Sequence, residues 1–274
     1  MNELLSSFLS NDSAFGKLMT RCGVVIGANL MFVLFSLPVI TIGASIAALH
    51  YVMLKALRGD GQINPFKCFW RGFRSNFRQA TIAWLLIAAL AVFLLFDLRI
   101  CLQAGMPLEL LKYPLYGMLL AEAILAVCLF PVMAAFEDTL PRLLQNTFYF
   151  AIKRAYVLPV LLFFNFFPLY LTYTDPQKTM PLYAFLWVFF GYGAIAMLNS
   201  RLLLPAMKPW LPLVDEYGDF ILTEEGEKQT AAGKNLPDGP EGSRAAGLYR
   251  SDPDAADEDR AAQKTLEDME RLGM

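Results

Sequence analysis

The stretch from Asn64 to Phe96, NPFKCFWRGFRSNFRQATIAWLLIAALAVFLLF, decides the fold. Asn64 and Pro65 are typical of the N-cap and first turn of a helix. Aromatic and basic side chains then each recur at helical spacing, the aromatic ones being Phe66, Phe69, Trp70, Phe73 and Phe77 and the basic ones Lys67, Arg71, Arg74 and Arg78. A run without formal charge, residues 80–96, follows directly. The pattern predicts an amphipathic helix on the cytoplasmic surface of a membrane that leads into a membrane-spanning helix.

The basic face of this helix is expected to contact the membrane surface. We expect five side chains at the level of anionic lipid headgroups, namely Lys67, Trp70, Arg71, Arg74 and Arg78. Because the helix leads straight into an apolar segment, lipid explains these cations better than nucleic acid, and we expect no nucleic-acid partner.

Composition agrees with an integral membrane protein. Hydrophobic residues make up 56% of the chain and charged residues 18%, whereas a soluble domain carries about 25% charge. Charge is also unevenly distributed. Residues 1–214 hold 16 Lys and Arg against 9 Asp and Glu, a net charge of +7, and residues 215–274 hold 7 against 16, a net charge of −9. The two parts are therefore expected in different surroundings.

The length of the first apolar region requires a break in the helix. Residues 22–54 carry no formal charge, and a helix of these 33 residues would be about 50 Å long against a hydrocarbon core of about 30 Å. Pro38, Thr41 and Gly43 are the expected place of the break. The second helix is short, and residues 42–54 either cross the membrane or re-enter it.

The whole pattern predicts an all-α membrane protein, a polytopic bundle of five to six transmembrane helices. The membrane domain is residues 1–214, with an amphipathic helix at 65–78 and apolar helices expected at about 15–37, 42–58, 80–98, 113–136, 156–173 and 180–204. Residues 215–274 form an acidic tail that is too polar to bury a core, so we expect it to be mostly disordered. An alternative for this tail is a docking segment for a partner protein.

The distribution of Lys and Arg predicts the orientation. Residues 55–78 hold six of them, and residues 137–155, expected to be a loop, hold three, whereas the opposite side of the membrane holds only Arg99, Lys112 and Lys178. By the positive-inside rule, the basic segments and the C-terminus are cytoplasmic. Lys17 and Arg21 favour a cytoplasmic N-terminus as well, which gives six crossings.

Four polar side chains lie in apolar helices: Asn29, His50, Glu122 and Asn165. Such groups are costly in hydrocarbon and are candidate functional residues, although hydrogen bonding between helices is the plainer interpretation for the two asparagines. For His50 a packed or interfacial position is the plainer interpretation. Glu122 is expected to point into the bundle, with Asn29, Asn165 or His50 as its partner, beside a close helix contact at Gly117 and Ala121.

Motifs of soluble enzymes are missing from the sequence. It contains no phosphate-binding glycine loop, no HExxH and no GxSxG, and His50 is its one histidine. The four cysteines are scattered and are expected to be small apolar core residues. We therefore expect no catalytic residue, no metal site and no cofactor.

Three segments resemble a known family. They are residues 37–45 with Leu54-Lys55 and Arg58-Gly59-Asp60, then residues 69–81 with Trp84, and more weakly residues 130–136. They are similar to the YesL-like bacterial membrane proteins, the domain of unknown function 624, over roughly residues 10–205. The resemblance implies a small multi-helix protein of the bacterial plasma membrane, often encoded near sugar-uptake transporters, without established catalytic residues.

Three classes of function follow from the residues and the resemblance together. The first is a non-enzymatic accessory protein of carbohydrate uptake, with ABC sugar-transporter subunits as partners or with a role in their regulation. The second is a small permease or channel, for which Asn29, Glu122 and Asn165 offer a thin polar path. The third is a membrane enzyme that acts on lipid or lipid-linked sugar, for which the sequence offers few nucleophiles and bases.

Overall fold

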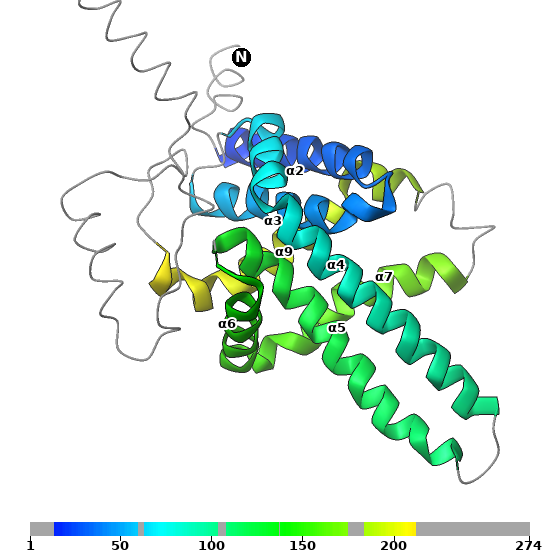
Figure 1. The fold of residues 1–274 in the computed structure, drawn as a ribbon. Coiled ribbons are helices and arrows are strands. Elements are labelled where there is room, and N and C mark those ends of the chain that lie inside the picture. The colour runs from blue at the N-terminus through cyan, green and yellow to red at the C-terminus, as the bar shows by residue number, and fades with distance from the viewer. Residues whose placement is uncertain (1–13, 60–62, 104–107, 137, 175–183, 212–274) are drawn as a thin grey trace, which may run out of the picture.

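The computed structural model describes residues 14–59, 63–103, 108–136, 138–174 and 184–211. In this part of the chain every regular element is a helix, and no β-strand occurs (Figure 1). The prediction of an all-α chain is confirmed for these residues. The predicted acidic tail, residues 215–274, lies outside the described residues.

The first apolar region breaks where its length required. Helix α2 spans Ala14–Phe35, a short 3-10 turn η1 spans Val39–Thr41, and α3 spans Ile42–Arg58. Thr41 closes the turn, since its Oγ1 donates hydrogen bonds to the carbonyl oxygens of Phe35 at 2.6 Å and Pro38 at 2.8 Å. The bond to Phe35 satisfies a carbonyl group that the end of α2 would otherwise leave unpaired, whereas the Pro38 carbonyl oxygen also accepts from the Thr41 backbone N–H at 3.0 Å.

The amphipathic and apolar segments after Asn64 form one helix. Helix α4 spans Pro65–Gln103, and Asn64 Oδ1 accepts hydrogen bonds from the backbone N–H groups of Phe66 at 3.0 Å and Lys67 at 3.3 Å. The separate helices expected at 65–78 and 80–98 are therefore continuous, because neither glycine nor proline interrupts residues 73–103. At 39 residues, α4 is about 58 Å long, roughly twice the thickness of a hydrocarbon core.

Helix α3 lies at the centre of the core and runs beside the first half of α4. Residues 43–45 and 47–56 of α3 are buried. Gly43 lies against Ala80 of α4, and Tyr51 lies against Gly72. The second half of α5, which spans Lys112–Ala135, adds a buried stretch from Val127 onward.

A helical hairpin projects from this core. The second half of α4 and the first half of α5 run side by side away from the other helices, joined at the turn η2, Leu108–Leu111 (Figure 1). Large apolar side chains are exposed along both, among them Leu86, Phe93 and Tyr113. Such a surface fits a hydrocarbon environment better than water.

Helix α6, Leu140–Lys153, occupies a segment that we expected as a basic loop. Its buried side chains include Leu143, Thr147 and Phe150, at the i, i+4 and i+7 spacing of one helix face. The expectation of a loop was wrong. The basic residues Arg142, Lys153 and Arg154 indicated a loop, but the helical spacing of the apolar side chains determines the structure here.

The last helices complete the bundle. Helix α7 spans Leu158–Thr174 after the turn η3, Ala155–Val157. A further helix runs from Ala184 through a π-helical turn η4, Trp187–Gly191, into α9, Tyr192–Met207, and ends in the turn η5, Lys208–Trp210.

Within the described residues, five helical segments are long and apolar enough to cross a membrane: Val39–Arg58, Pro65–Gln103, Glu109–Ala135, Ala155–Thr174 and Ala184–Trp210. The number agrees with the predicted five to six spans. Residues 42–54, expected to be the short one, belong to a segment of full length, and the described part of α2 adds a further apolar stretch, Met19–Phe35.

Candidate functional site

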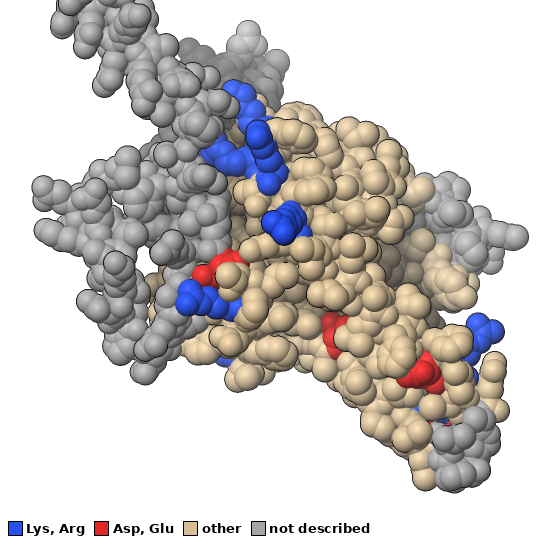
Figure 2. Space-filling model, in the orientation of Figure 1, with Lys and Arg blue, Asp and Glu red and all other residues tan. Residues whose placement is uncertain are grey.

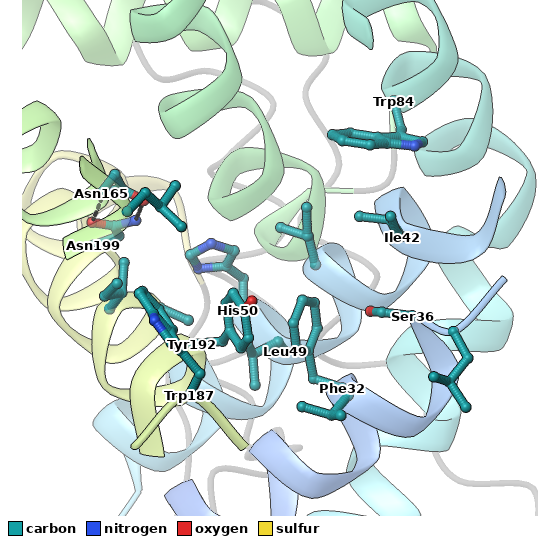
Figure 3. Close-up of a pocket in the computed structure, with 16 residues that line it drawn as sticks. Phe32, Ser36, Ile42, Leu49, His50, Trp84, Asn165, Trp187, Tyr192 and Asn199 are labelled. Atoms are coloured by element: carbon teal, nitrogen blue, oxygen red, sulfur yellow. Dashed lines mark hydrogen bonds between the residues drawn. The ribbon is translucent and has the colours of Figure 1, made fainter. Parts of the chain in front are cut away.

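A cavity of about 550 Å³ lies among α2, α3, α4, α7 and the η4–α9 helix (Figure 3). Sixteen residues line it: Phe32, Val33, Ser36, Leu37, Ile42, Ile46, Leu49, His50, Trp84, Asn165, Leu169, Trp187, Tyr192, Ile195, Ala196 and Asn199. Its walls are mostly apolar, with a few polar side chains, which is the usual character of a small-molecule site. None of the lining residues is Lys, Arg, Asp or Glu, so the cavity suits an uncharged occupant.

Aromatic rings form one wall of the cavity. The ring centroids of Trp187 and Tyr192 are 4.7 Å apart, and those of Tyr192 and Phe32 are 4.8 Å apart. Trp187 Nε1 donates a hydrogen bond to Thr172 Oγ1 of α7 at 3.2 Å, which fixes the indole. The indole lies against Gly191, where any side chain would overlap it. The wall is therefore held in place from two helices.

The π-helical turn that carries Trp187 is supported by Asn29 of α2. Asn29 Nδ2 donates to the carbonyl oxygens of Trp187 at 2.9 Å and Val188 at 2.6 Å, and its Oδ1 accepts from Gly193 N–H at 2.7 Å. A π-turn disturbs the i to i+4 bonding of a helix, so its backbone groups need other partners. Asn29, fully buried, supplies them from the neighbouring helix.

Two hydrogen-bonded pairs form the polar part of the cavity. Asn165 and Asn199 bond reciprocally through their amides, at 2.9 Å and 3.2 Å. His50 Nδ1 lies 3.0 Å from Ser200 Oγ. In Figure 3 the Asn165–Asn199 pair lies at one side of the cavity, and the His50 ring faces the space between this pair and Leu49.

The opposite side of the cavity lies where α2 ends. Trp84 of α4 stands there, and its Nε1 donates to the Val39 carbonyl oxygen at 3.0 Å. Ser36 also lines this side, and its Oγ is buried without a hydrogen-bond partner among the described residues. Leu37, which is 74% exposed, belongs to the lining as well, so the cavity has an apolar mouth here.

The structure brings together some of the predicted polar residues. His50 and Asn165 line the same cavity, and Asn29 lies behind it under η4. Glu122 is elsewhere, on the projecting part of α5, where it is buried and its Oε1 has no hydrogen-bond partner among the described residues. The predicted pairing of Glu122 with Asn29, Asn165 or His50 is therefore wrong, since each of these three binds another partner.

The predicted close contact beside Glu122 is also absent. Gly117 and Ala121 are exposed, and a Cβ atom on Gly117 would meet nothing within 4 Å. Small residues at this spacing permit close packing but do not by themselves bring a helix to that face.

The predicted lipid-interface residues lie on the outside of α4. Lys67, Trp70, Arg74 and Arg78 are exposed and Arg71 is partly exposed, and Figure 2 shows Lys and Arg gathered where α4 begins. The aromatic face is divided. Phe69 and Phe73 are buried, with their ring centroids 5.9 Å and 5.0 Å from that of Phe35, so these two rings belong to the core rather than to the headgroups.

Several cavity residues were not expected from the sequence, chiefly Ser36, Trp187, Tyr192 and Asn199. The pair Asn199-Ser200 in an apolar helix carried the same signal as Asn165, a polar group in hydrocarbon. The aromatic residues carried no such signal, because α7 and residues 185–192 are rich in aromatic residues. Of the cysteines, Cys68, Cys101 and Cys128 are buried, and within the described ranges no three His, Cys, Asp or Glu side chains gather in a metal-binding group.

Comparison with known proteins shows which family part of the chain resembles. Residues 25–98 match the family described as "Protein of unknown function, DUF624". The chain is 28% identical over 129 residues to the uncharacterized protein YesL of Bacillus subtilis (strain 168), and 24% identical over 137 residues to the uncharacterized protein YteU of the same strain. The matches cover 46% and 47% of this chain and 61% of each relative. No solved structure matches the chain significantly.

The region matched by the family runs from α2 into the apolar half of α4 and so includes the α3–α4 packing at the centre of the core. It supplies Asn29, His50 and Trp84 to the site, whereas Glu122 and Asn165 lie beyond it. The resemblance predicted from the sequence, to the YesL-like proteins with a domain of unknown function 624, is confirmed by these matches.

Proposed function

We propose that this chain is a non-enzymatic membrane protein that assists carbohydrate uptake, as an accessory to an ABC sugar transporter or to its regulation. The resemblance to the YesL-like family supports the link to sugar uptake. The observation that supports the accessory role is that the buried polar residues form hydrogen bonds between helices. Asn29, Asn165 and His50 each bind a residue of another helix.

These hydrogen bonds between helices favour a rigid helical bundle over one that conducts a solute. A channel or permease needs polar groups that face a continuous path for its solute. Here the amides of Asn29 and Asn165 fasten α2 and α7 to the η4–α9 helix, so they stabilise one arrangement of the helices. A bundle held in this way suits a protein that binds and positions a partner.

The proposal includes a place in the cell. The exposed cations Lys67, Arg74 and Arg78 suit anionic headgroups on the cytoplasmic side of a bacterial plasma membrane. The C-terminus lies on the same side, together with the N-terminus, in the orientation that the positive-inside rule favours.

A permease remains the second candidate because of one observation, the apolar-mouthed cavity with His50 and Asn199 at its polar part. Such a cavity could hold a solute during transport. The two functions differ in what the pure protein does alone.

The test compares association with transport. The tagged full-length protein is purified from native membranes and its partners are quantified by mass spectrometry, with an unrelated tagged polytopic protein as the control. We expect subunits of an ABC sugar transporter in near-stoichiometric amounts. A deletion strain should take up labelled sugar more slowly, and pure protein in proteoliposomes should transport none. Sugar uptake by those proteoliposomes would favour the permease, and turnover of a lipid-linked sugar would favour an enzyme.

A further inference from the structure

We propose that the cavity binds a neutral lipid-like alcohol, an apolar molecule with a single hydroxyl group that His50 and Asn199 hold. This assignment does not depend on a role in carbohydrate uptake. It rests on the chemistry of the cavity walls, on the unused hydrogen-bonding capacity at its polar part, and on the nature of its mouth.

The walls exclude a charged ligand. No lining residue carries a formal charge, so an ionic headgroup would lose its hydration without gaining a counter-charge. Trp187, Tyr192 and Trp84 offer aromatic surfaces to an apolar body. A volume of about 550 Å³ lies within the usual range of small-molecule sites.

The polar part has room for about one hydroxyl group. Asn165 Nδ2 already donates to the Leu161 carbonyl and to Asn199, so both of its N–H groups are used. Among the described residues Asn199 Nδ2 donates to Asn165 alone, which leaves one N–H group. His50 binds Ser200 through Nδ1, and its Nε2 has no partner among the described residues although the side chain is 96% buried, its exposure being 4%.

A hydroxyl group is both a donor and an acceptor. It can therefore accept from Asn199 and donate to His50 Nε2, in the tautomer of the ring whose Nδ1–H donates to Ser200 Oγ. A sugar ring carries several hydroxyl groups, and most of them would stay unpaired against the apolar walls. The free groups at this polar part therefore select a molecule with one hydroxyl rather than a polyol. Ser36 Oγ is also unpaired, but it lies on the opposite side of the cavity, near Trp84.

The mouth of the cavity also favours a ligand from the bilayer. Leu37 and Leu169 both line the cavity and are exposed to the surroundings of the bundle. An apolar molecule can reach the cavity past these side chains without crossing a charged surface.

The test uses tryptophan fluorescence of the full-length protein in phosphatidylcholine nanodiscs. Trp70→Phe and Trp210→Phe leave Trp84 and Trp187, which both line the cavity, as the reporters. The probe is a dibrominated octadecanol, whose bromine atoms quench nearby indoles. Its methyl ether, which cannot donate a hydrogen bond, is the matched ligand, and dibrominated phosphatidylcholine measures quenching by bulk lipid.

We expect saturable quenching by the alcohol at a mole fraction where brominated phosphatidylcholine quenches weakly, and binding of the methyl ether that is weaker by roughly five- to tenfold. His50→Phe should weaken binding of the alcohol by a similar factor and leave the ether unaffected. Tyr173→Phe, which removes an exposed hydroxyl outside the cavity, is the control and should change neither.

Three outcomes would overturn the assignment: equal binding of the alcohol and its ether, quenching no stronger than that of bulk lipid, or competition by soluble methyl glucoside, which would assign the cavity to a polyol. If His50→Phe fails to fold, the comparison of the two ligands on the unaltered cavity decides alone.

Discussion

Gly43 of α3 lies so close to Ala80 of α4 that a Cβ atom on Gly43 would overlap the Ala80 carbonyl oxygen. The same atom would also overlap the Cβ of Trp84. Nearer the other end of the α3–α4 contact, Gly72 of α4 leaves space for the side chain of Tyr51, which a Cβ atom on Gly72 would overlap. Small residues at both positions let the two backbones approach closely, which gains dispersion contacts that do not depend on water. This approach makes α3 the centre of the core.

Gly43→Ala should therefore destabilise the protein. The added methyl group meets main-chain atoms, which cannot move aside as a flexible side chain can, and we expect a loss of about 1–3 kcal/mol. The measurement is the unfolding temperature in detergent. Gly23→Ala is the matched control, since a Cβ there meets nothing within 4 Å and alanine favours a helix. Equal unfolding temperatures for the two variants would contradict the close contact.

The sequence could predict the main helices because their length and charge pattern follow from the thickness of a bilayer. The break near Pro38 and Thr41 had to exist, since residues 22–54 are too long for one crossing. The partners of the helices could not be predicted in the same way. Phe69 and Phe73 have the spacing of an interfacial aromatic face, and the same spacing serves a core contact with Phe35.

The candidate site was predictable only in part for a related reason. A polar residue in hydrocarbon, such as Asn29 or Asn165, must find a partner, and this necessity is visible in the sequence. The partners are 158 and 34 residues away along the chain, so they follow from packing rather than from local pattern. A cavity likewise depends on how side chains from several helices pack together, so the spacing of residues along the sequence does not predict it.

Asn29→Ala should destabilise the helix that carries Trp187. The substitution leaves two carbonyl groups and the Gly193 N–H without their partner, and each buried unpaired group costs about 1–3 kcal/mol. Asn76→Ala is a control with the same chemical change, because in the part of the chain that the structure describes Asn76 bonds only to Gly72 and Ser75 of its own helix. We expect the lower unfolding temperature for Asn29→Ala, with a shift in the tryptophan emission. A smaller effect than that of Asn76→Ala would refute the role of Asn29 under the π-turn.

The Asn165–Asn199 pair should show coupled energetics. Each single change to alanine leaves one buried amide without its partner, whereas the double change removes both. The double variant should therefore lose less stability than the sum of the single variants, by about 1 kcal/mol. Unfolding free energies from titration with sodium dodecyl sulfate in mixed micelles provide the cycle. Strict additivity would mean that the two amides do not interact in the membrane protein.

The orientation can be tested with introduced cysteines, because the natural Cys68 and Cys101 are each only 8% exposed and label poorly. In a variant without the natural cysteines, Ser75→Cys and Gln103→Cys place thiols at exposed positions near opposite ends of α4. A membrane-impermeant maleimide should label residue 103 in intact protoplasts and residue 75 only after the membrane is opened. Labelling in the opposite order would reverse the orientation favoured by the positive-inside rule.

Glu122 is the most informative single residue for function, because its buried Oε1 has no hydrogen-bond partner among the described residues. Glu122→Gln keeps the shape of the side chain and should leave folding unchanged. Glu122→Leu removes an unsatisfied group and should raise the unfolding free energy by about 1–2 kcal/mol. Glu122→Lys places a cation in the apolar hairpin and should prevent stable insertion.

The phenotype of these variants then distinguishes structure from function. A residue that only packs should allow Glu122→Leu to complement a deletion strain as well as the unaltered protein does. Loss of complementation by Glu122→Leu, in a protein that is more stable and fully inserted, would show that the carboxyl group acts in the function itself. Normal insertion of Glu122→Lys would instead mean that the side chain reaches water or a headgroup, contrary to the burial of Glu122 on α5.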